Sequence, residues 1–292
     1  LRDENGDEII GAHSIRYDYL VLAVGGVSND FGVPGVQKHA MFLEDRQQAD
    51  RFRSRLLNAC FRVSHALANG DDGAQLNLVI VGGGATGVEL SAELFNAAKA
   101  LRNYGLEVFD ESRMKVTLIE AGPRILPALP EKLSNAATEE LRALGMEVLT
   151  GAVVAEVGAD RVRTKDGREI KADLTLWAAG VRAPDYLADL DGLAVDRANR
   201  LLVDAHLQTT VDDRIFALGD CASFSPEGGD RPLPPRAQAA QQMAKTAFGY
   251  LRARIEGGRM KPFVYRARGS LVSLSRFSTV GSLMGYLVGG RM

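Results

Sequence analysis

The chain has 292 residues, 46% of them hydrophobic and 25% charged, and its 35 Lys and Arg residues against 37 Asp and Glu residues give a net charge of −2. These values are typical of a globular protein with one or two domains, and they exclude a largely disordered chain. They also argue against a protein that binds nucleic acid through a basic excess. The long apolar stretches at 76–88 and 277–290 carry no charge, but both are shorter than the about 18 residues of a membrane-spanning helix.

The first quarter of the chain contains three predicted elements. Apolar and polar residues alternate over 1–15 around Asn5-Gly6, which predicts a hairpin. The continuous apolar run at 19–24, which ends at Gly25, predicts a strand buried on both faces of a sheet. Apolar residues at three- and four-residue steps over 43–67 predict a helix.

The central part of the chain alternates predicted strands and helices. Strands are expected at 76–81, 115–120, 146–150 and 174–178, helices at 88–102 and 131–144, and a small antiparallel meander over 153–171. This alternation predicts an α/β fold with a parallel, doubly wound sheet. Beyond residue 185 the chain is rich in turns, with a strand expected at 215–218, a helix at 235–256, and short strands at 209–210 and 270–278.

Three glycines, Gly82, Gly84 and Gly87, follow the first of these central strands in the pattern G-x-G-x-x-G. The first glycine permits a tight turn, the second lets a pyrophosphate approach the backbone, and the third lets helix and strand pack closely. The positive end of the following helix then faces the phosphates. Because a strand and a helix flank the pattern, a dinucleotide site is a better interpretation than a plain turn before a core helix.

Glu120 ends the next predicted strand, where a carboxylate accepts hydrogen bonds from the adenosine ribose and repels a 2′-phosphate. This position favours NAD over NADP. Glu120 follows the glycines by more than the about 20 residues that the motif expects, and an insertion around 105–113 accounts for the excess. Two alternatives stay open: a surface glutamate at a strand end, and a phosphate held by the nearby Arg124.

Further polar residues have both a functional and a structural interpretation. Glu89 lies near the start of the predicted helix, where a carboxylate either interacts with the helix dipole or relays a proton beside the nicotinamide. Asp220 follows a strand and Gly219, and it either belongs to a turn or lies near a sugar or phosphate. Gln238 and Gln242 share one helix face, either as polar residues of a helix start or as a binding pair.

The two cysteines, Cys60 and Cys221, do not form the close sequence pair that a disulfide reductase uses, which disfavours such an enzyme. Both are expected to be packing residues. Two cysteines also exclude a disulfide framework and a Cys-rich zinc site. No metal is expected, because metal-binding spacing is missing among the histidines, which are His13, His39, His65 and His206.

Taken together, five segments resemble the type II NADH:quinone oxidoreductases, which are membrane-associated members of the two-dinucleotide-binding flavoproteins. The resemblance extends over nearly the whole chain, and the combination is far more specific than any single motif. The segments are Gly82–Glu93 (GGGATGVELSAE), Glu120–Pro130 (EAGPRILPALP), Trp177–Gly180 (WAAG), Gly219–Ala222 (GDCA) and Ala237–Gln242, which fits the family pattern A-Q-x-A-x-Q.

This resemblance implies a role for each candidate residue. Positions of this chain that match the family's motifs are expected to contact FAD or NADH, to transfer protons, or to lie on the quinone side. The implied FAD contacts are Ala23, Gly25, Gly219 and Asp220; those of NADH are Gly82, Gly84, Gly87 and Glu120; Gly180 is a further cofactor-binding residue; Glu89 handles protons; and Gln238 and Gln242 lie on the quinone side.

The sequence also departs from the family pattern, which begins with a strand and its own G-x-G-x-x-G for FAD and ends in an amphipathic membrane-anchoring segment. We therefore expect a piece of a longer protein, with a Rossmann-like NAD domain inserted in an incomplete FAD-type domain. The expected organisation is an FAD-domain remnant and linker helix at 1–73, the NAD-binding domain at 74–201, a return to the FAD domain at 202–258, and the start of a C-terminal region at 259–292.

The resemblance implies an oxidoreductase that passes hydride from NADH to FAD and two electrons on to a membrane quinone, without pumping protons. The implied partners are NADH, a quinone and the cytoplasmic face of a membrane, reached through a C-terminal segment; nucleic acid is not among them, and a homodimer is compatible with the family. Two alternatives stay open. One is another electron acceptor, either oxygen or an iron–sulfur protein, and the other is a catalytically silent NAD-binding piece that lacks FAD.

Overall fold

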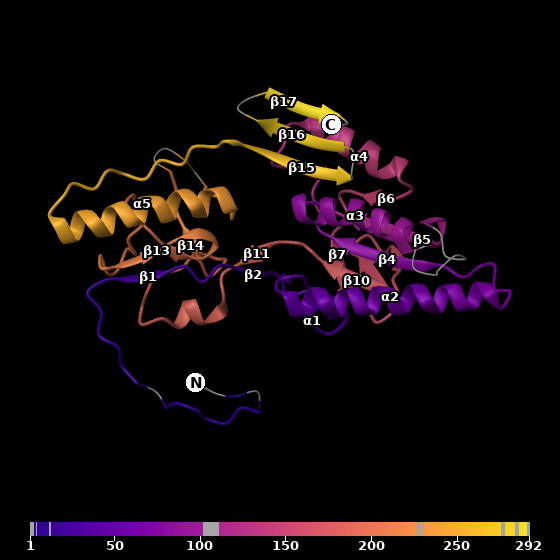
Figure 1. Cartoon of the computed structure of the whole chain (residues 1–292), viewed down its shortest axis with the longest axis horizontal. Helices are drawn as coiled ribbons and strands as arrows, with labels where there is room; N and C mark the ends of the chain where they lie inside the picture. The colour runs from indigo at the N-terminus through magenta and orange to yellow at the C-terminus, as the bar shows by residue number, and fades with distance from the viewer. Residues whose placement is uncertain are drawn as a thin grey trace. The chain divides into compact units, whose positions relative to one another are not determined.

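The computed structural model describes residues 3, 5–11, 13–101, 111–226, 229, 231–275, 278–283 and 286–290 (Figure 1). The chain divides into two compact units, each of which contains two segments. Unit 1 contains Leu1–Gly26 and Arg182–Arg266, and unit 2 contains Val27–Val181 and Ala267–Met292. Most of the insertion expected around 105–113 lies outside the described residues.

A five-stranded parallel sheet forms the centre of unit 2, which confirms the predicted α/β fold. Every neighbouring pair of strands is parallel, and β4 occupies the middle of the sheet. In spatial order the strands are β3 (Ala40–Met41), β10 (Leu174–Trp177), β4 (Leu76–Val81), β5 (Met114–Ile119) and β6 (Glu147–Leu149).

The long helices pack against one face of the sheet, which is formed by every second residue of each strand. Leu76, Leu78 and Ile80 of β4 share a core with apolar residues from the three long helices of unit 2. The longest of these helices begins after Asp45, whose side chain accepts a hydrogen bond from the backbone N–H of Gln48 and so caps the helix. The helices of unit 2 are α1 (Val36–His39), α2 (Arg46–Ala68), α3 (Ala85–Leu101) and α4 (Glu131–Ala143).

The remaining alternating sheet residues pack in a second core. Val79, Val81 and Ile119 join Val154 and Val162 of an antiparallel meander in this core. The meander was expected over 153–171 and consists of β7 (Val154–Val157), β8 (Arg161–Thr164) and β9 (Glu169–Lys171). Side chains therefore alternate along each central strand between the two cores.

The C-terminal segment of unit 2 forms a three-stranded antiparallel sheet beside α3 and α4 (Figure 1). Val272 and Leu274 of this sheet join the same core as the three helices. Its strands are β15 (Gly269–Ser275), β16 (Ser278–Leu283) and β17 (Tyr286–Gly290). The first of them lies where a short strand was expected at 270–278.

The long helix of unit 1 is α5 (Ala237–Glu256), which ends at Gly257 with a left-handed φ of 80°. The core of unit 1 contains Phe216, Met243 and Tyr250. The paired strands of this unit are parallel: β1 (Leu20–Leu22) with β13 (Ile215–Ala217), and β12 (Leu201–Leu202) with β14 (Ala222–Ser223). Elsewhere β2 (Val27–Ser28) pairs with β11 (Val181–Arg182), and short 3-10 turns occur at Glu111–Arg113, Asp185–Asp189 and Gly219–Cys221.

Three sequence expectations are corrected. The strand at 19–24 is not buried on both faces: β1 lies in a two-stranded sheet with β13, and Val21 is 39% exposed. The described residues of 1–15 do not form the expected hairpin. They form a turn, in which the Gly6 N–H donates to the Asp3 carbonyl, and one bridge residue, Glu8. The strand expected at 209–210 is an isolated bridge between Thr209 and Val203.

The boundaries of the two compact units differ from the domain boundaries expected at 73/74 and 201/202. The helix α2 belongs to unit 2, because Phe52, Ala59 and Val63 are buried in the same core as β4. The segment Arg182–Arg266 belongs to unit 1, where Ala183 and Leu187 join the core around Phe216. The functional domains themselves stay a prediction.

Candidate functional site

The turn between β4 and α3 requires glycine at two of its three motif positions. Gly82 has a φ of 115°, and a Cβ atom there would lie 2.7 Å from the backbone of Ala178. A Cβ atom at Gly87 would lie 1.9 Å from the carbonyl oxygen of Gly82. Both approaches are closer than van der Waals contact allows, so these glycines let the helix and the strand meet.

Gly84, the middle glycine, faces open space. No atom lies within 4 Å of the position that its Cβ would take. The protein's own packing therefore does not demand a glycine there, in contrast to Gly82 and Gly87. A ligand that approaches the backbone at the start of α3 accounts for the absence of a side chain.

The carboxylate of Glu120 is held beside this turn. Its Oε2 atom accepts a hydrogen bond of 2.7 Å from the Gly83 N–H, and its Oε1 atom accepts one of 2.6 Å from the Gly122 N–H. These bonds orient the carboxylate at the carboxyl ends of β4 and β5. Each oxygen keeps a second lone pair, which can accept a hydrogen bond from a ligand hydroxyl.

The turn and Glu120 border a cavity of about 550 Å³ in unit 2, which we name the carboxyl-end cavity. Its walls are mostly apolar, and its volume lies in the range of small-molecule sites. The indole of Trp177 forms part of the wall, and its Nε1–H donates a hydrogen bond of 2.8 Å to the Asn29 carbonyl. Of the predicted cofactor residues, Gly82, Gly84, Glu120 and Gly180 line this cavity.

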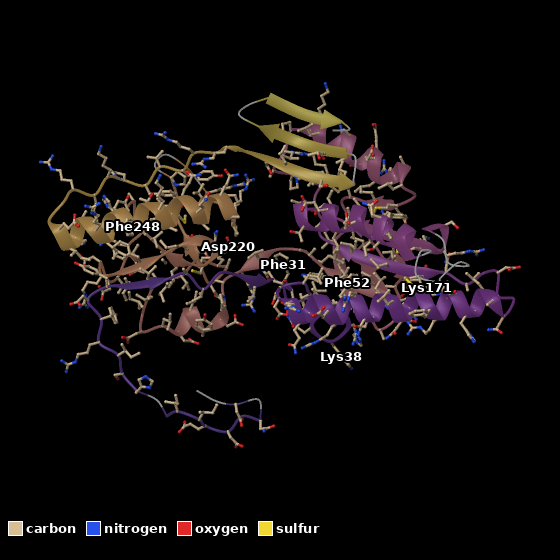
Figure 2. All side chains as sticks on the ribbon, viewed as in Figure 1. Phe31, Lys38, Phe52, Lys171, Asp220 and Phe248 are labelled. Atoms are coloured by element: carbon tan, nitrogen blue, oxygen red, sulfur yellow. The ribbon has the colours of Figure 1, made fainter. Side chains whose placement is uncertain are left out.

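Phe31 is a wall residue that the sequence did not indicate. It has a φ of 52°, and the residue is 62% exposed although it lines the carboxyl-end cavity (labelled in Figure 2). A Cβ atom at Gly180, whose φ is 70°, would lie 2.4 Å from the Cζ atom of Phe31. Gly180 therefore gives room to this ring. No local pattern around residue 31 signals the contact, because the two residues come from distant segments.

Arg124 is engaged by the loop that contains it. Its guanidinium donates hydrogen bonds to the carbonyl oxygens of Leu126, Pro127 and Leu129, over 2.9 to 3.2 Å. The same loop is attached to the glycine turn, because the Leu126 N–H donates to the Gly83 carbonyl. Arg124 thus shapes the loop, and these bonds disfavour the alternative in which it holds a 2′-phosphate.

Unit 1 contains a cavity of about 350 Å³, which we name the unit 1 cavity. All four residues that the resemblance assigned to FAD line it: Ala23, Gly25, Gly219 and Asp220. The opposite wall is the start of α5, through Ala237, Ala240 and Ala244. Both glycines have left-handed φ values, 75° for Gly25 and 71° for Gly219, so the turns after β1 and β13 need glycine.

Glu89 does not line the carboxyl-end cavity. It lies in α3, and its Oε1 atom accepts a hydrogen bond of 3.2 Å from the backbone N–H of Ser273 in β15. The contact joins the start of α3 to the C-terminal sheet of unit 2. The prediction that Glu89 handles a proton stays a prediction.

Gln238 and Gln242 lie on α5, in its first two turns, as the sequence predicted. The amide of Gln242 pairs with the backbone of Arg266: its Nε2 donates to the carbonyl over 2.9 Å, and its Oε1 accepts from the N–H over 3.0 Å. Gln242 therefore fixes the segment that follows α5. A quinone-side role for the two glutamines stays a prediction.

The cysteines are buried and belong to different units. Cys60 packs in α2, where burial raises the pKa of its thiol to about 11, well above the range in which a nucleophilic thiolate forms at neutral pH. Cys221 is also buried, and its thiol lies 3.1 Å from the carbonyl oxygen of Leu218. Within the described ranges, no helix combines the length and the apolar character that crossing a bilayer requires.

Comparison with known proteins identifies relatives of this fold and these motifs. The family model of the pyridine nucleotide-disulphide oxidoreductases matches residues 2–244. A type II NADH:quinone oxidoreductase of Haemophilus influenzae is 47% identical over 291 residues, which cover 96% of this chain and 65% of the relative. The chain thus spans slightly less than two thirds of that protein's length.

Two further comparisons agree with this match. A type II NADH:quinone oxidoreductase of Staphylococcus aureus is 32% identical over 280 residues, which cover 94% of this chain and 68% of the relative. The solved structure of NDH2 from Plasmodium falciparum in complex with NADH superposes with a TM-score of 0.85 at 22% identity, over 99% of this chain and 73% of that one. The chain therefore belongs to the pyridine nucleotide-disulphide oxidoreductase family, and within it to the type II NADH:quinone oxidoreductases.

Proposed function

We propose that the whole protein oxidises NADH and passes two electrons through FAD to a membrane quinone, without pumping protons. The family binds FAD and a pyridine nucleotide. The observation that carries the proposal is the presence of two glycine-edged cavities, one in each unit, each lined by residues expected to contact one of the two cofactors.

NADH fits the carboxyl-end cavity on the chemistry of its walls. The glycine turn and the start of α3 would hold the pyrophosphate, because backbone N–H groups and the positive helix end favour an anion there. Glu120 would accept hydrogen bonds from the adenosine ribose, and its charge would repel a 2′-phosphate. The hydrogen bonds of Arg124 to three carbonyls support the same preference for NADH over NADPH.

Part of FAD would lie in the unit 1 cavity, where no atom lies within 4 Å of the position that a Cβ atom would take at Gly25. Asp220 would contact its ribityl or phosphate region. When bound, FAD supplies the acceptor for the hydride of NADH and the donor of electrons to the quinone. The residues of this chain would bind and orient the two nucleotides.

Glu89 is proposed to hold and transfer a proton in this reaction. Replacement by Gln keeps an oxygen that can accept from the Ser273 N–H, so Glu89→Gln removes the charge while the contact with β15 persists. We expect slower quinone reduction, with NADH affinity unchanged within a few fold. Unchanged steady-state turnover would rule out the proton-handling role.

Gln238 and Gln242 are proposed to lie on the quinone side of the flavin. Their spacing on α5 places both on one helix face. The amide of Gln242 is paired with the backbone of Arg266, so its proposed contribution is to shape this side of the site. The KM for quinone in Gln238→Ala, measured with NADH saturating, tests this assignment.

A quinone is favoured over the other acceptors. Disulfide reduction by this chain's own thiols is disfavoured, because Cys60 and Cys221 are buried in different units. Oxygen and small iron–sulfur proteins need a separate test. The membrane surface is the proposed location of the whole protein, because its electron acceptor dissolves in the bilayer.

The test is an acceptor comparison on the purified protein loaded with FAD. The visible absorbance of oxidised flavin reports loading, and NADH oxidation is then measured with a short-chain quinone, with oxygen and with a [2Fe–2S] ferredoxin. We expect the highest kcat/KM with the quinone. Failure to take up FAD on reconstitution would contradict the proposal for this chain, and a preference for ferredoxin or oxygen would overturn the choice of acceptor.

A further inference from the structure

Unit 2 contains a second large cavity that the proposed reaction does not use. Its volume is about 590 Å³, and it lies at the amino-terminal ends of the central strands, between them and β9. We name it the amino-end cavity. None of its wall residues lines the carboxyl-end cavity. Its polar and charged wall residues are Asn77, Lys115, Thr117, Glu147, Arg168, Glu169 and Lys171.

Two of these wall residues are polar although they are almost completely buried. Asn77 is 3% exposed and Thr117 is 2% exposed, in strands whose other residues are mostly apolar. The Asn77 Nδ2 atom donates to Asp173 over 2.9 Å, and the Thr117 hydroxyl donates to Glu147 over 3.2 Å. The same sheet face is apolar at the other end, at Val81. The polar lining is therefore confined to the amino-terminal ends.

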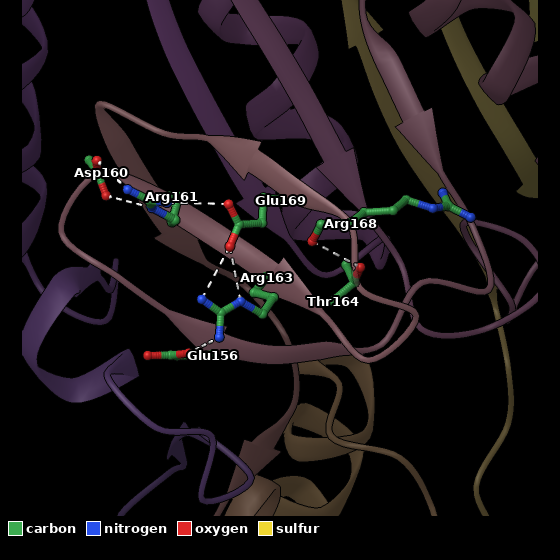
Figure 3. Close-up of polar contacts among 7 residues, drawn as sticks. All are labelled: Glu156, Asp160, Arg161, Arg163, Thr164, Arg168 and Glu169. Carbon is green, nitrogen blue, oxygen red and sulfur yellow. Dashed lines mark hydrogen bonds and ion pairs between the residues drawn. The ribbon is translucent and has the colours of Figure 1, made fainter.

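The acidic residues of the meander are neutralised by arginines rather than by the lysines of the cavity. Glu169 accepts from Arg161 over 3.2 Å and pairs with Arg163 over 3.1 Å, in a ladder that runs across the strands (Figure 3). The side chain of Arg168 points away from this ladder, and its guanidinium pairs with Asp166 over 2.9 Å.

Lys115 and Lys171 make no ion pair with any carboxylate of the described residues (Lys171 is labelled in Figure 2). Arg161, through its hydrogen bond, is the main reason that the pKa of the neighbouring Asp160 is lowered, and Lys171 contributes least. Both lysines line the cavity. Glu147 and the Thr117 hydroxyl lie on the same wall.

We propose that the amino-end cavity binds a small hydroxylated anion, with its phosphate or carboxylate group on Lys115 and Lys171. An ammonium group donates charge-assisted hydrogen bonds to either type of anion. Glu147 accepts hydrogen bonds from hydroxyl groups of the ligand. The polar side chains of Asn77 and Thr117 replace water molecules that would otherwise contact the ligand. A volume of about 590 Å³ holds a molecule of this size.

The experiment is a calorimetric titration of the whole chain with ribose 5-phosphate and, separately, with citrate, which distinguish a phosphate from a carboxylate ligand. Uncharged ribose is the control for the anionic group. We expect at least one of the anions to bind and ribose not to. Lys115→Gln and Lys171→Gln should each raise the Kd about tenfold, as the loss of one hydrogen bond from a charged group predicts.

Two variants serve as matched controls. Lys132→Gln removes an exposed lysine from α4, away from the cavity, and should leave the Kd unchanged. Lys115→Arg keeps the positive charge and should restore most of the affinity. The titration is repeated with saturating NADH, which should not displace the anion, because the two cavities share no wall residue.

Three results would overturn the proposal. One is the absence of binding by both anions. Another is binding that Lys115→Gln and Lys171→Gln leave unchanged. The third is competition by NADH, which would place the anion in the carboxyl-end cavity. None of these results bears on electron transfer to quinone, so the proposal and the proposed function can fail independently.

Discussion

The two cavities of unit 2 lie at opposite ends of the same parallel strands and differ in how their walls are built. At the carboxyl ends, glycines and apolar side chains leave space, and the polar contacts come from backbone groups and Glu120. At the amino ends, charged and amide side chains supply the polarity. The first arrangement suits a ligand recognised at its pyrophosphate by backbone N–H groups. The second suits a ligand recognised by side-chain charge, so the comparison separates two modes of binding within one sheet.

The largest expected effect is on stability, and it should differ between Gly87, which is tightly packed, and Gly84, which faces open space. Gly87→Ala places a Cβ atom 1.9 Å from the Gly82 carbonyl oxygen, and we expect the free energy of unfolding to fall by about 3 kcal/mol. Gly84→Ala meets no atom within 4 Å, so its stability should change by less than about 0.5 kcal/mol. Urea denaturation measures both.

Gly84→Ala is informative in a second assay. If a pyrophosphate approaches the backbone there, the added methyl group should weaken NADH binding about tenfold while the fold is unchanged, a loss of about 1.4 kcal/mol. Binding of the anion at the amino-end cavity should not change. Normal NADH affinity in this variant would remove the functional reason for the middle glycine.

Glu120→Gln should weaken NADH binding about tenfold, because the charged acceptor for the ribose hydroxyls is lost. NADPH should be affected less, so the ratio of the two Kd values moves toward one. This ratio, measured by fluorescence titration with each nucleotide, is insensitive to a modest loss of stability. A ratio that stays at its wild-type value would contradict the assigned role of Glu120.

Thr117→Val tests the amino-end cavity from its buried wall. Valine has nearly the shape of threonine, and only the hydroxyl that donates to Glu147 is lost. We expect a change in unfolding free energy of about 1 kcal/mol and no change in NADH affinity. Weaker NADH binding would show that the two ends of the sheet do not act separately.

Cys60 of α2, which lines neither cavity of unit 2, tests the alkaline range of stability. Burial raises the pKa of its thiol from 9.0 to about 11, so the folded state favours the protonated form. The stabilisation is complete below pH 9 and is lost as the pH rises toward 11. Cys60→Ala should reduce the slope of stability against pH in this window. An unchanged slope would mean that another group dominates the alkaline range.

The sequence predicted the central strands of unit 2 well, because long apolar runs between glycines and helix signals leave few alternatives. The central strand Leu76–Val81 begins and ends as expected. Gly82 and Gly87 could be predicted because their tight backbone packing leaves a trace in residue type. Gly84 and Glu120 were predicted from their places in the motif and at the end of the next strand. The same reasoning failed at 19–24, since an apolar run does not reveal how many neighbours a strand has.

Other parts of the site leave no such trace. Phe31 lines the carboxyl-end cavity only because Gly180 makes room for it, and this contact depends on tertiary structure. The carbonyls that engage Arg124 cannot be inferred from its residue type. Asn77 and Thr117 are a partial signal that was overlooked: polar residues at alternating positions of buried strands indicate a polar cavity, although they do not indicate its ligand.

The most direct test of the account uses Trp177, the only tryptophan of the chain, which lines the carboxyl-end cavity. Tryptophan emission overlaps the absorption of reduced nicotinamide, so NADH bound in this cavity must quench it. We predict saturable quenching by NADH that Gly84→Ala and Glu120→Gln shift to higher concentration and that Lys115→Gln leaves unchanged. Quenching that Lys115→Gln weakens, with Glu120→Gln behaving like the wild type, would contradict the assignment of NADH to the carboxyl ends of the sheet.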